Sequence, residues 1–240
     1  MLSSIQPVSE QLSALRIPRT GSTVVPACGQ LTSHLAVHVA NKQSTKRKTI
    51  ENHIARGFNQ AYQAQITEFM PLLVALGRSK IEAALGVRTG EHKLFVETYF
   101  DQPLEQAMAE KGIHCPRHRL AEIGNLYSRS SRFTMPLLLL TAMGLFQQHI
   151  SLLVFTATSQ LQRMMEHGGL TLHHLTDADE ARLGEPKQNW GSYYQTAPKV
   201  VAARVADIIQ LTLDNPKLRA GYEQFAPLVP AFSAELGAQL

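Results

Sequence analysis

The chain has 240 residues, of which 44% are hydrophobic and 18% are charged. This is enough to bury one substantial core, so a single elaborated domain is expected. Lys and Arg number 23 against 19 Asp and Glu, a net charge of +4. Such a mild excess favours an anionic ligand, but it lacks the dense basic face of a nucleic-acid binder, so nucleic acid is excluded as a partner.

The cysteines and the apolar segments exclude other classes. Only Cys28 and Cys115 are present, and two widely separated thiols predict neither a disulfide framework nor a zinc-ligand pair. Met1–Gln11 lacks the basic and apolar regions of a secretion signal, which predicts a cytoplasmic protein. Met135–Phe146 is too short to span a bilayer, so no transmembrane segment is expected and this stretch is predicted to be a buried helix.

The first part of the chain predicts an arm, a strand and a helix. Proline and glycine interrupt residues 1–30, which predicts an extended arm before a domain formed by residues 31–240. A strand is predicted over His34–Ala40, followed by a helix from Lys46 towards Gln65 that Ser44 or Thr45 would cap. Four apolar side chains fall on one face of this helix: Ile50, Ile54, Phe58 and Tyr62.

Three apolar segments separated by turns then predict an antiparallel meander: Phe69–Leu76, Ile81–Arg88 and Leu94–Phe100. A short helix is predicted over Asp101–Met108, with Pro103 in its first turn.

The second half of the chain alternates between strand and helix patterns. Its predicted elements are strands Leu120–Leu126 and Leu152–Thr156, helices Ser131–Gln148 and Ser159–His167, a strand Leu170–Leu175, the aromatic segment Trp190–Gln195, and a closing helix from Pro198 to about Leu213. Strand, helix, strand implies a crossover connection between parallel strands. The expected class is therefore α/β (α+β), a mixed central sheet with helices on both faces.

Four segments carry a family resemblance. They read ETYFD at Glu97–Asp101, AEIGNLYS at Ala121–Ser128, VFTAT at Val154–Thr158 and WGSYY at Trp190–Tyr194. In this order they resemble the thermostable haemolysin family, over a region from about Phe69 to Val200. That family is named for a lytic activity, yet its fold is similar to the GNAT acyltransferases and to acyl-homoserine-lactone synthases.

The resemblance implies a GNAT-like sheet in which two central parallel strands splay apart, here Leu120–Leu126 and Leu152–Thr156. It further implies that the pantetheine arm of an acyl thioester lies between them. The helix start after the first strand would bind its phosphate, because free amides and the helix dipole favour an anion there. That segment is Ser128, Arg129, Ser130, Ser131 and Arg132, which could equally be a solvated helix start. The glycine-containing GNAT loop is missing, which makes an acyl-carrier protein a serious alternative to coenzyme A.

Glu122 is the first candidate for a catalytic base, because a carboxylate in an otherwise apolar strand has its pKa raised. It also resembles in position a strand glutamate of acyl-homoserine-lactone synthases. A structural ion pair with Arg88 is the alternative, and Arg88 is itself a substrate-binding candidate. Asn125, another such candidate, would face away from Glu122 unless Gly124 introduces a bulge.

Other polar residues near these strands are candidates for binding the substrate. Thr156 and Thr158 share one face of the second strand, although strand propensity also explains them. Glu97 and Asp101 suit a cationic amine, and Asp101 could instead cap the helix that follows it.

The densest aromatic cluster supplies the last candidates. Tyr193 or Tyr194 is a candidate acid for the leaving thiolate, a role that tyrosine plays in many GNAT enzymes, and Trp190 is a candidate substrate contact. Core packing is the alternative for these rings. His173 and His174 lack a convergent partner, so no metal site is expected.

The resemblance, together with these candidate residues, implies an N-acyltransferase that moves a fatty acyl group from acyl-CoA or acyl-carrier protein to an amino acid-like or other small amine, with no tightly bound cofactor. The carrier protein or an acyl-activating ligase would be a partner. Met135–Phe146 and the pair Met164–Met165 would help to line the acyl pocket, or simply pack the core. A membrane-lytic protein and a non-catalytic acyl or carrier-protein binder are the alternatives.

Overall fold

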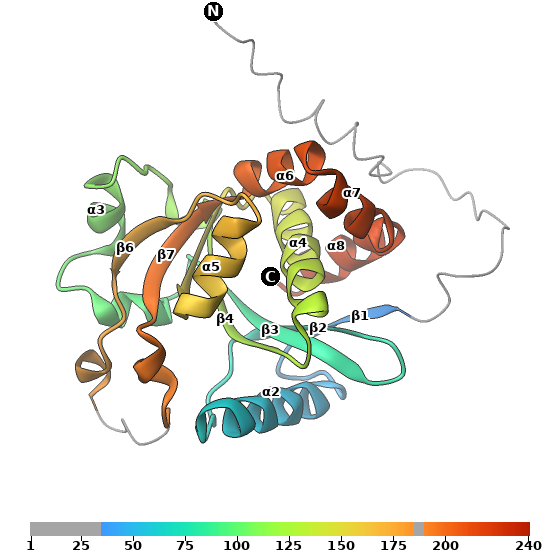
Figure 1. Ribbon diagram of the computed structural model, residues 1–240, viewed down its shortest axis with the longest axis horizontal. Coiled ribbons are helices and arrows are strands. Elements are labelled where there is room, and N and C mark those ends of the chain that lie inside the picture. Colours follow the sequence, from blue (N-terminus) through green and yellow to red (C-terminus); the bar gives the residue numbers. More distant parts are fainter. Residues whose placement is uncertain (1–34, 185–189) are drawn as a thin grey trace, which may run out of the picture.

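The computed structural model describes residues 35–184 and 190–240, so the predicted arm at residues 1–30 lies outside the described residues. Within those ranges the chain forms a mixed seven-stranded sheet in the order β1-β2-β3-β4-β5-β7-β6 (Figure 1). The strands are β1 Ala36–Ala40, β2 Leu72–Gly77, β3 Ile81–Thr89, β4 Leu120–Ser128, β5 Leu152–Ala157, β6 His173–Asp177 and β7 Lys199–Arg204. The predicted α/β class is confirmed.

The two central strands are the parallel pair. Leu120–Ile123 of β4 pairs with Leu152–Phe155 of β5, and beyond these four positions the strands no longer pair with each other. β5 continues to pair with β7 as far as Ala157, whereas β4 continues along β3 to Ser128. The predicted splayed pair is confirmed, and it opens after Ile123 and Phe155.

A bulge in β4 lies where the pair opens. Gly86 on β3 pairs with Gly124, but Ala84 pairs with Tyr127, so β4 carries one residue more than β3 across this interval. Asn125 absorbs the extra residue with a φ of 50°, in the left-handed region that asparagine tolerates better than most residues. The bulge expected at Gly124 is confirmed.

Helices cover both faces of the sheet. On one face lie α4 (Ser131–Gln147), α5 (Ser159–His167), α6 (Val205–Asp214), α7 (Pro216–Glu223) and α8 (Val229–Gly237), and on the other lie α2 (Arg47–Tyr62), α3 (Leu104–Ala109) and the 3₁₀ segment η1 (Phe95–Tyr99). The sheet has a hydrophobic core on each face, because successive side chains of β5 point to opposite faces. Leu153 and Phe155 face the first group of helices, while Leu152 and Val154 face the second.

One predicted strand is wrong. Leu94–Phe100 forms η1 instead of the third strand of a meander, and β3 pairs directly with β4. The Glu97 carboxylate accepts a hydrogen bond from the Leu94 amide at 2.7 Å, which closes a local turn. The apolar alternation in this segment therefore reflects packing of a 3₁₀ turn.

The C-terminal prediction is half wrong. Residues 199–204 of the predicted closing helix form strand β7, which inserts between β5 and β6, and the helix α6 begins at Val205. Val200–Ala203 is a continuous apolar run that is fully buried between two strands. The sequence pattern of such a run does not distinguish a strand from a helix.

Two predicted caps are also wrong. The N-cap of α2 is Lys46 and not Ser44 or Thr45, and it makes no side-chain cap bond. Asp101 precedes α3 by three residues, and Pro103 occupies the N-cap. Ile50, Ile54 and Phe58 are buried on one face of α2 as predicted.

Across the described ranges, no helix is both long enough and apolar enough to cross a membrane.

Candidate active site

Glu122 lies in the last paired stretch of β4 and points towards η1. Only 1% of the residue is exposed, and its two carboxylate oxygens accept hydrogen bonds from the Phe95 and Val96 amides at 2.7 and 2.9 Å. Burial raises the pKa of Glu122 to about 7, against the opposing effect of these two amides and of the nearby Arg88 charge. The carboxyl group is thus fixed in direction and exchanges its proton near neutral pH.

Arg88 lies directly across from Glu122 in the β3–β4 register but makes no ion pair with it. Its Nη1 donates to the Lys93 carbonyl at 3.1 Å. The alternative interpretation of Glu122 as half of a structural ion pair is therefore not what the geometry shows. Arg88 and Glu122 instead border the same cavity.

A cavity of about 550 Å³ occupies the opening between the splayed strands. Its volume lies within the range typical of small-molecule sites. The lining is mainly apolar, and polar candidate residues border it as well, among them Glu122, Arg88, Asn125, Thr156 and Thr158. Met164 and Met165 of α5 also line it, whereas from Met135–Phe146 only Leu138 does.

The two candidate threonines differ in what they contact. Thr158 caps α5, because its hydroxyl accepts a hydrogen bond from the Leu161 amide at 3.3 Å. The Thr156 hydroxyl is buried and makes no well-formed hydrogen bond with the described residues. It lies near the Tyr99 hydroxyl, where it weakly opposes the rise that burial causes in the pKa of Tyr99. Thr156 is the threonine that retains hydrogen-bonding capacity for a ligand.

The aromatic cluster forms one wall of the cavity. Trp190 and Tyr193 line it, and Trp190 packs against Tyr193 at a ring-centroid distance of 5.5 Å. Tyr194 does not line the cavity, but its hydroxyl lies 2.6 Å from that of Tyr99, which does. Burial raises the pKa of Tyr193 and of Tyr194, and it raises the pKa of Tyr99 to about 12, so all three phenols are protonated at neutral pH.

The predicted phosphate segment is divided between two surfaces. Ser128 and Ser131 line the cavity, whereas Arg129 lines a different hollow. Ser130 is the N-cap of α4 and its carbonyl accepts from the Ser128 hydroxyl at 2.6 Å. Arg132 lies over the Phe133 ring at 4.7 Å.

Glu97 and Asp101 lie away from the cavity and are occupied by arginines. Glu97 accepts from Arg117 Nη1 at 2.7 Å, and although burial acts against it, this bond and the Leu94 amide hold the pKa of Glu97 below its ordinary value. Asp101 forms a double contact with the guanidinium of Arg182. Both carboxylates hold loops around η1 together.

Sequence reasoning missed two contributors to the site. Tyr99 lies within the predicted strand Leu94–Phe100 and Phe69 and Met70 lie within the predicted strand Phe69–Leu76, yet Tyr99 and the loop Glu68–Met70 both border the cavity. Met70 packs over Gly86 and Gly124, where an added Cβ would come within 2.4 Å of its side chain. Two glycines facing each other on adjacent strands were the available signal for such a close approach.

Comparison with known proteins decides the family. The model of the family described as thermostable hemolysin matches residues 40–209. The chain belongs to the thermostable hemolysin family. No curated protein matches the chain.

Several solved structures are similar in fold to this thermostable hemolysin family member, although their sequences are only distantly similar to it. LasI, an AHL synthase, is 12% identical, with 72% of this chain and 91% of LasI covered and a TM-score of 0.50. TofI, solved with an inhibitor and MTA, is 13% identical over 77% and 99%, with a TM-score of 0.51. FeeM, an N-acyl amino acid synthase from uncultured soil microbes, is 13% identical over 71% and 92%, with a TM-score of 0.50. The GNAT-like fold that the resemblance implied is confirmed.

Proposed function

We propose that the protein is an N-acyltransferase that moves a fatty acyl group from an acyl thioester, either acyl-CoA or acyl-carrier protein, to an amino acid-like amine. The observation that carries the proposal is the position of Glu122. A buried carboxyl with a pKa of about 7 borders a mainly apolar cavity at the point where two parallel strands part. A group that titrates near the working pH is well suited to general-base catalysis.

The donor would enter between β4 and β5. In this arrangement the pantetheine arm lies between the unpaired ends of the strands, where Thr156 offers a hydroxyl. Ser128 ends β4 and Ser131 begins α4, and both line the cavity. The dipole of a 17-residue helix favours an anionic phosphate there. The acyl chain would extend along the apolar side of the cavity, towards Met164 and Met165.

The chemical step requires two proton transfers. The amine nitrogen attacks the thioester carbonyl, the C–N bond forms and the C–S bond breaks, and the nitrogen loses a proton to Glu122. The leaving thiolate takes a proton, for which Tyr193 is the candidate donor because it lines the cavity, and the proton that Glu122 takes from the amine replaces it on Tyr193 through solvent.

The charges bordering the cavity favour an acceptor that carries both an amine and a carboxylate. Arg88 is the only Lys or Arg among the described residues that line it, and it stands beside Glu122. An α-amino acid carries both groups on one carbon, so they could reach two side chains that lie opposite each other on adjacent strands. The amine would face Glu122 while the carboxylate would bind the guanidinium, which matches planar carboxylates well.

The test is to incubate the purified protein with long-chain acyl-CoA or acyl-carrier protein and a mixture of amino acids, and to measure free thiol and acyl amides by mass. We expect acyl amides, and a loss of rate of about a hundredfold or more in Glu122→Gln, as for removal of a general base. Glu166→Gln, an exposed change on α5, is the matched control. Thiol release that is equal in Glu122→Gln and the native protein would refute the assignment, and binding of thioester without any release would indicate a non-catalytic binder.

A further inference from the structure

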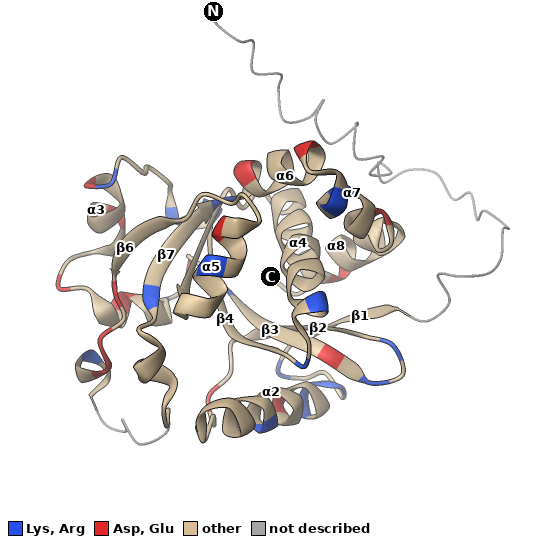
Figure 2. Ribbon diagram, viewed as in Figure 1, with Lys and Arg blue, Asp and Glu red and all other residues tan. Residues whose placement is uncertain are grey.

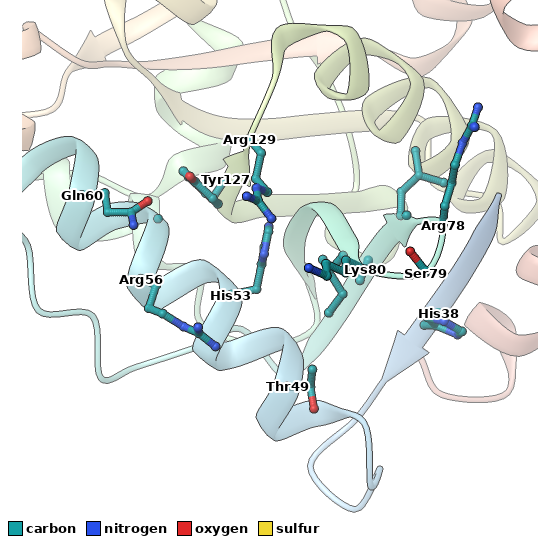
Figure 3. Close-up of a pocket in the computed structure, with 15 residues that line it drawn as sticks. His38, Thr49, His53, Arg56, Gln60, Arg78, Ser79, Lys80, Tyr127 and Arg129 are labelled. Atoms are coloured by element: carbon teal, nitrogen blue, oxygen red, sulfur yellow. The ribbon is translucent and has the colours of Figure 1, made fainter. Parts of the chain in front are cut away.

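A second cavity, of about 470 Å³, lies on the α2 side of the sheet (Figure 3). Its walls come from α2, from the turn between β2 and β3, and from the end of β4. Figure 2 shows basic residues on each of these three elements. The proposed acyl transfer makes no use of this cavity.

The lining of this basic cavity is positively charged. Arg56, Arg78, Lys80 and Arg129 all border it, and no Asp or Glu does. Among the described residues, none of these four cations takes part in an ion pair. Four unpaired cations around one hollow repel one another, so the free energy of the site falls when an anion enters.

His53 adds an unsatisfied donor or acceptor to the same space. Its Nε2 is buried and has no hydrogen-bond partner among the described residues. Burial, and then the charge of Arg129, lower the pKa of His53, whereas Glu82, which lies outside the lining, acts in the other direction and outweighs the smaller effect of Arg56. Figure 3 shows Arg129 extending to His53, with Lys80 pointing towards both.

Tyr127 gives the cavity an aromatic wall. Its ring lies 5.2 Å from that of His53, and it packs so closely on α2 that a Cβ at Gly57 would lie 2.2 Å from the ring. Tyr127 also lines the cavity between the splayed strands. Tyr127 therefore borders both the basic cavity and the candidate active site.

We propose that the basic cavity binds a phosphorylated small molecule, with its phosphoryl group among Arg56, Lys80, Arg129 and His53. A single carboxylate would leave most of this positive charge uncompensated, whereas a phosphomonoester carries about two negative charges and three acceptor oxygens. Arginine forks match phosphate oxygens in pairs. The volume exceeds that of a phosphate ion and leaves room for an organic group against Tyr127.

Binding is tested directly, by calorimetry of the full chain with pyrophosphate, with ADP and with coenzyme A in a buffer free of phosphate. We expect saturable binding that weakens with added salt, because the attraction is electrostatic. Arg56→Glu/Lys80→Glu should lower the affinity by at least about tenfold, which corresponds to about 1.4 kcal/mol. Lys42→Glu/Lys111→Glu, with the same change of charge at exposed positions outside both cavities, should change it by less than about twofold.

The three ligands distinguish the source of the phosphoryl group. If ADP and pyrophosphate bind and coenzyme A competes with them at the same site, the cavity holds the nucleotide end of the acyl donor. If coenzyme A does not compete, the ligand is a separate phosphorylated metabolite. Absence of saturable binding by all three, or equal affinity in Arg56→Glu/Lys80→Glu and the control, would overturn the proposal. These measurements involve no acyl group, so they are independent of the proposed transfer activity.

Discussion

At the residue scale, Glu122 experiences two opposing influences. Burial favours the neutral acid, whereas the Phe95 and Val96 amides favour the carboxylate. Because burial is the stronger influence, the pKa rises to about 7 in the folded chain from 4.5. A protonated Glu122 therefore stabilises the folded state relative to the ionised form.

This linkage gives a pH prediction. The stabilising effect of the proton is fully present below pH 4.5 and is lost as pH rises through about 7, at a cost of about 3 kcal/mol. Glu122→Gln cannot ionise, so its free energy of unfolding should lack this decline. Urea unfolding of both proteins from pH 4 to 8 measures the difference, and parallel profiles would contradict the pKa shift.

The catalytic consequence runs in the opposite sense. As a base, Glu122 must be ionised, so kcat/KM for acyl transfer should rise with pH through about 7 and then level off. The rising limb should be absent from the residual activity of Glu122→Gln. A rate that is independent of pH between 5 and 8 in the native protein would remove Glu122 from the proton transfer.

The candidate base could be predicted from sequence, but its hydrogen-bond donors could not. A carboxylate in an apolar strand is visible as a break in the pattern, and Glu122 is buried as expected. Its donors Phe95 and Val96 come from a segment whose apolar pattern predicts a strand. Local hydrogen bonds close that segment into a turn, among them the bond from the Leu94 amide to the Glu97 carboxylate and the bond from the Thr98 hydroxyl to the Phe95 carbonyl.

At the element scale, the bulge in β4 depends on Asn125. Its Oδ1 accepts from the Met70 amide at 2.8 Å, and its Nδ2 donates to the Glu68 carbonyl at 3.3 Å. The side chain thus joins the bulge to the loop that leads into β2. The bulge was predictable from the conflict between Asn125 and strand alternation, whereas the partner loop is 55 residues away in sequence.

Two substitutions separate the contributions of Asn125. Asn125→Gly tolerates the positive φ but lacks the two side-chain hydrogen bonds. Asn125→Ala lacks the same bonds and in addition disfavours the positive φ. We expect losses of about 1–3 kcal/mol for the unsatisfied Met70 amide in the first, and about 1 kcal/mol more in the second. Denaturant unfolding measures them, and a glycine variant less stable than the alanine variant would contradict the role given to the backbone angle.

The position of α5 yields a prediction about acyl chain length. Met164 lines the cavity, while the adjacent Arg163 is exposed and does not. Met164→Trp should fill the acyl end and lower kcat/KM for long-chain relative to short-chain donors by about tenfold or more, as expected for overpacking. Arg163→Trp is the control, and an unchanged chain-length profile in Met164→Trp would place the acyl chain elsewhere.

At the scale of the whole molecule, the C-terminal helices belong to the main core. Phe232 of α8 packs on Gly144 of α4, where a Cβ would lie 2.4 Å from its ring. Gln148 at the end of α4 also donates to the Ser233 carbonyl at 3.1 Å. The helix that begins at the splayed strands is thereby held from behind by the last helix of the chain.

Removal of this packing should destabilise the whole fold. Phe232 is 1% exposed, and Phe232→Ala should cost about 3–5 kcal/mol, as for other buried aromatic truncations. Leu240→Ala, at a residue that is 42% exposed, should change stability little. A single, shifted urea transition is expected in Phe232→Ala, and a change below about 1 kcal/mol would show that α8 is not part of the cooperative unit.

The strand order was only partly predictable. The crossover from β4 through α4 to β5 follows from the alternation of patterns. Insertion of β7 between β5 and β6 does not, because Val200–Ala203 has no alternation and pairs with strands on both sides. Buried central strands lose the period of two that identifies strands at a surface.

Trp190 is the only tryptophan of the chain, and it lies in the wall of the cavity between the splayed strands. Its indole also contacts Tyr193 and Tyr194 at ring-centroid distances of 5.5 and 5.9 Å. Emission excited at the indole band therefore comes from one position beside the candidate site. An acyl chain that enters the cavity would displace water from that ring and shift its emission to shorter wavelength, so the native protein carries a built-in optical reporter for titrating donors without a label.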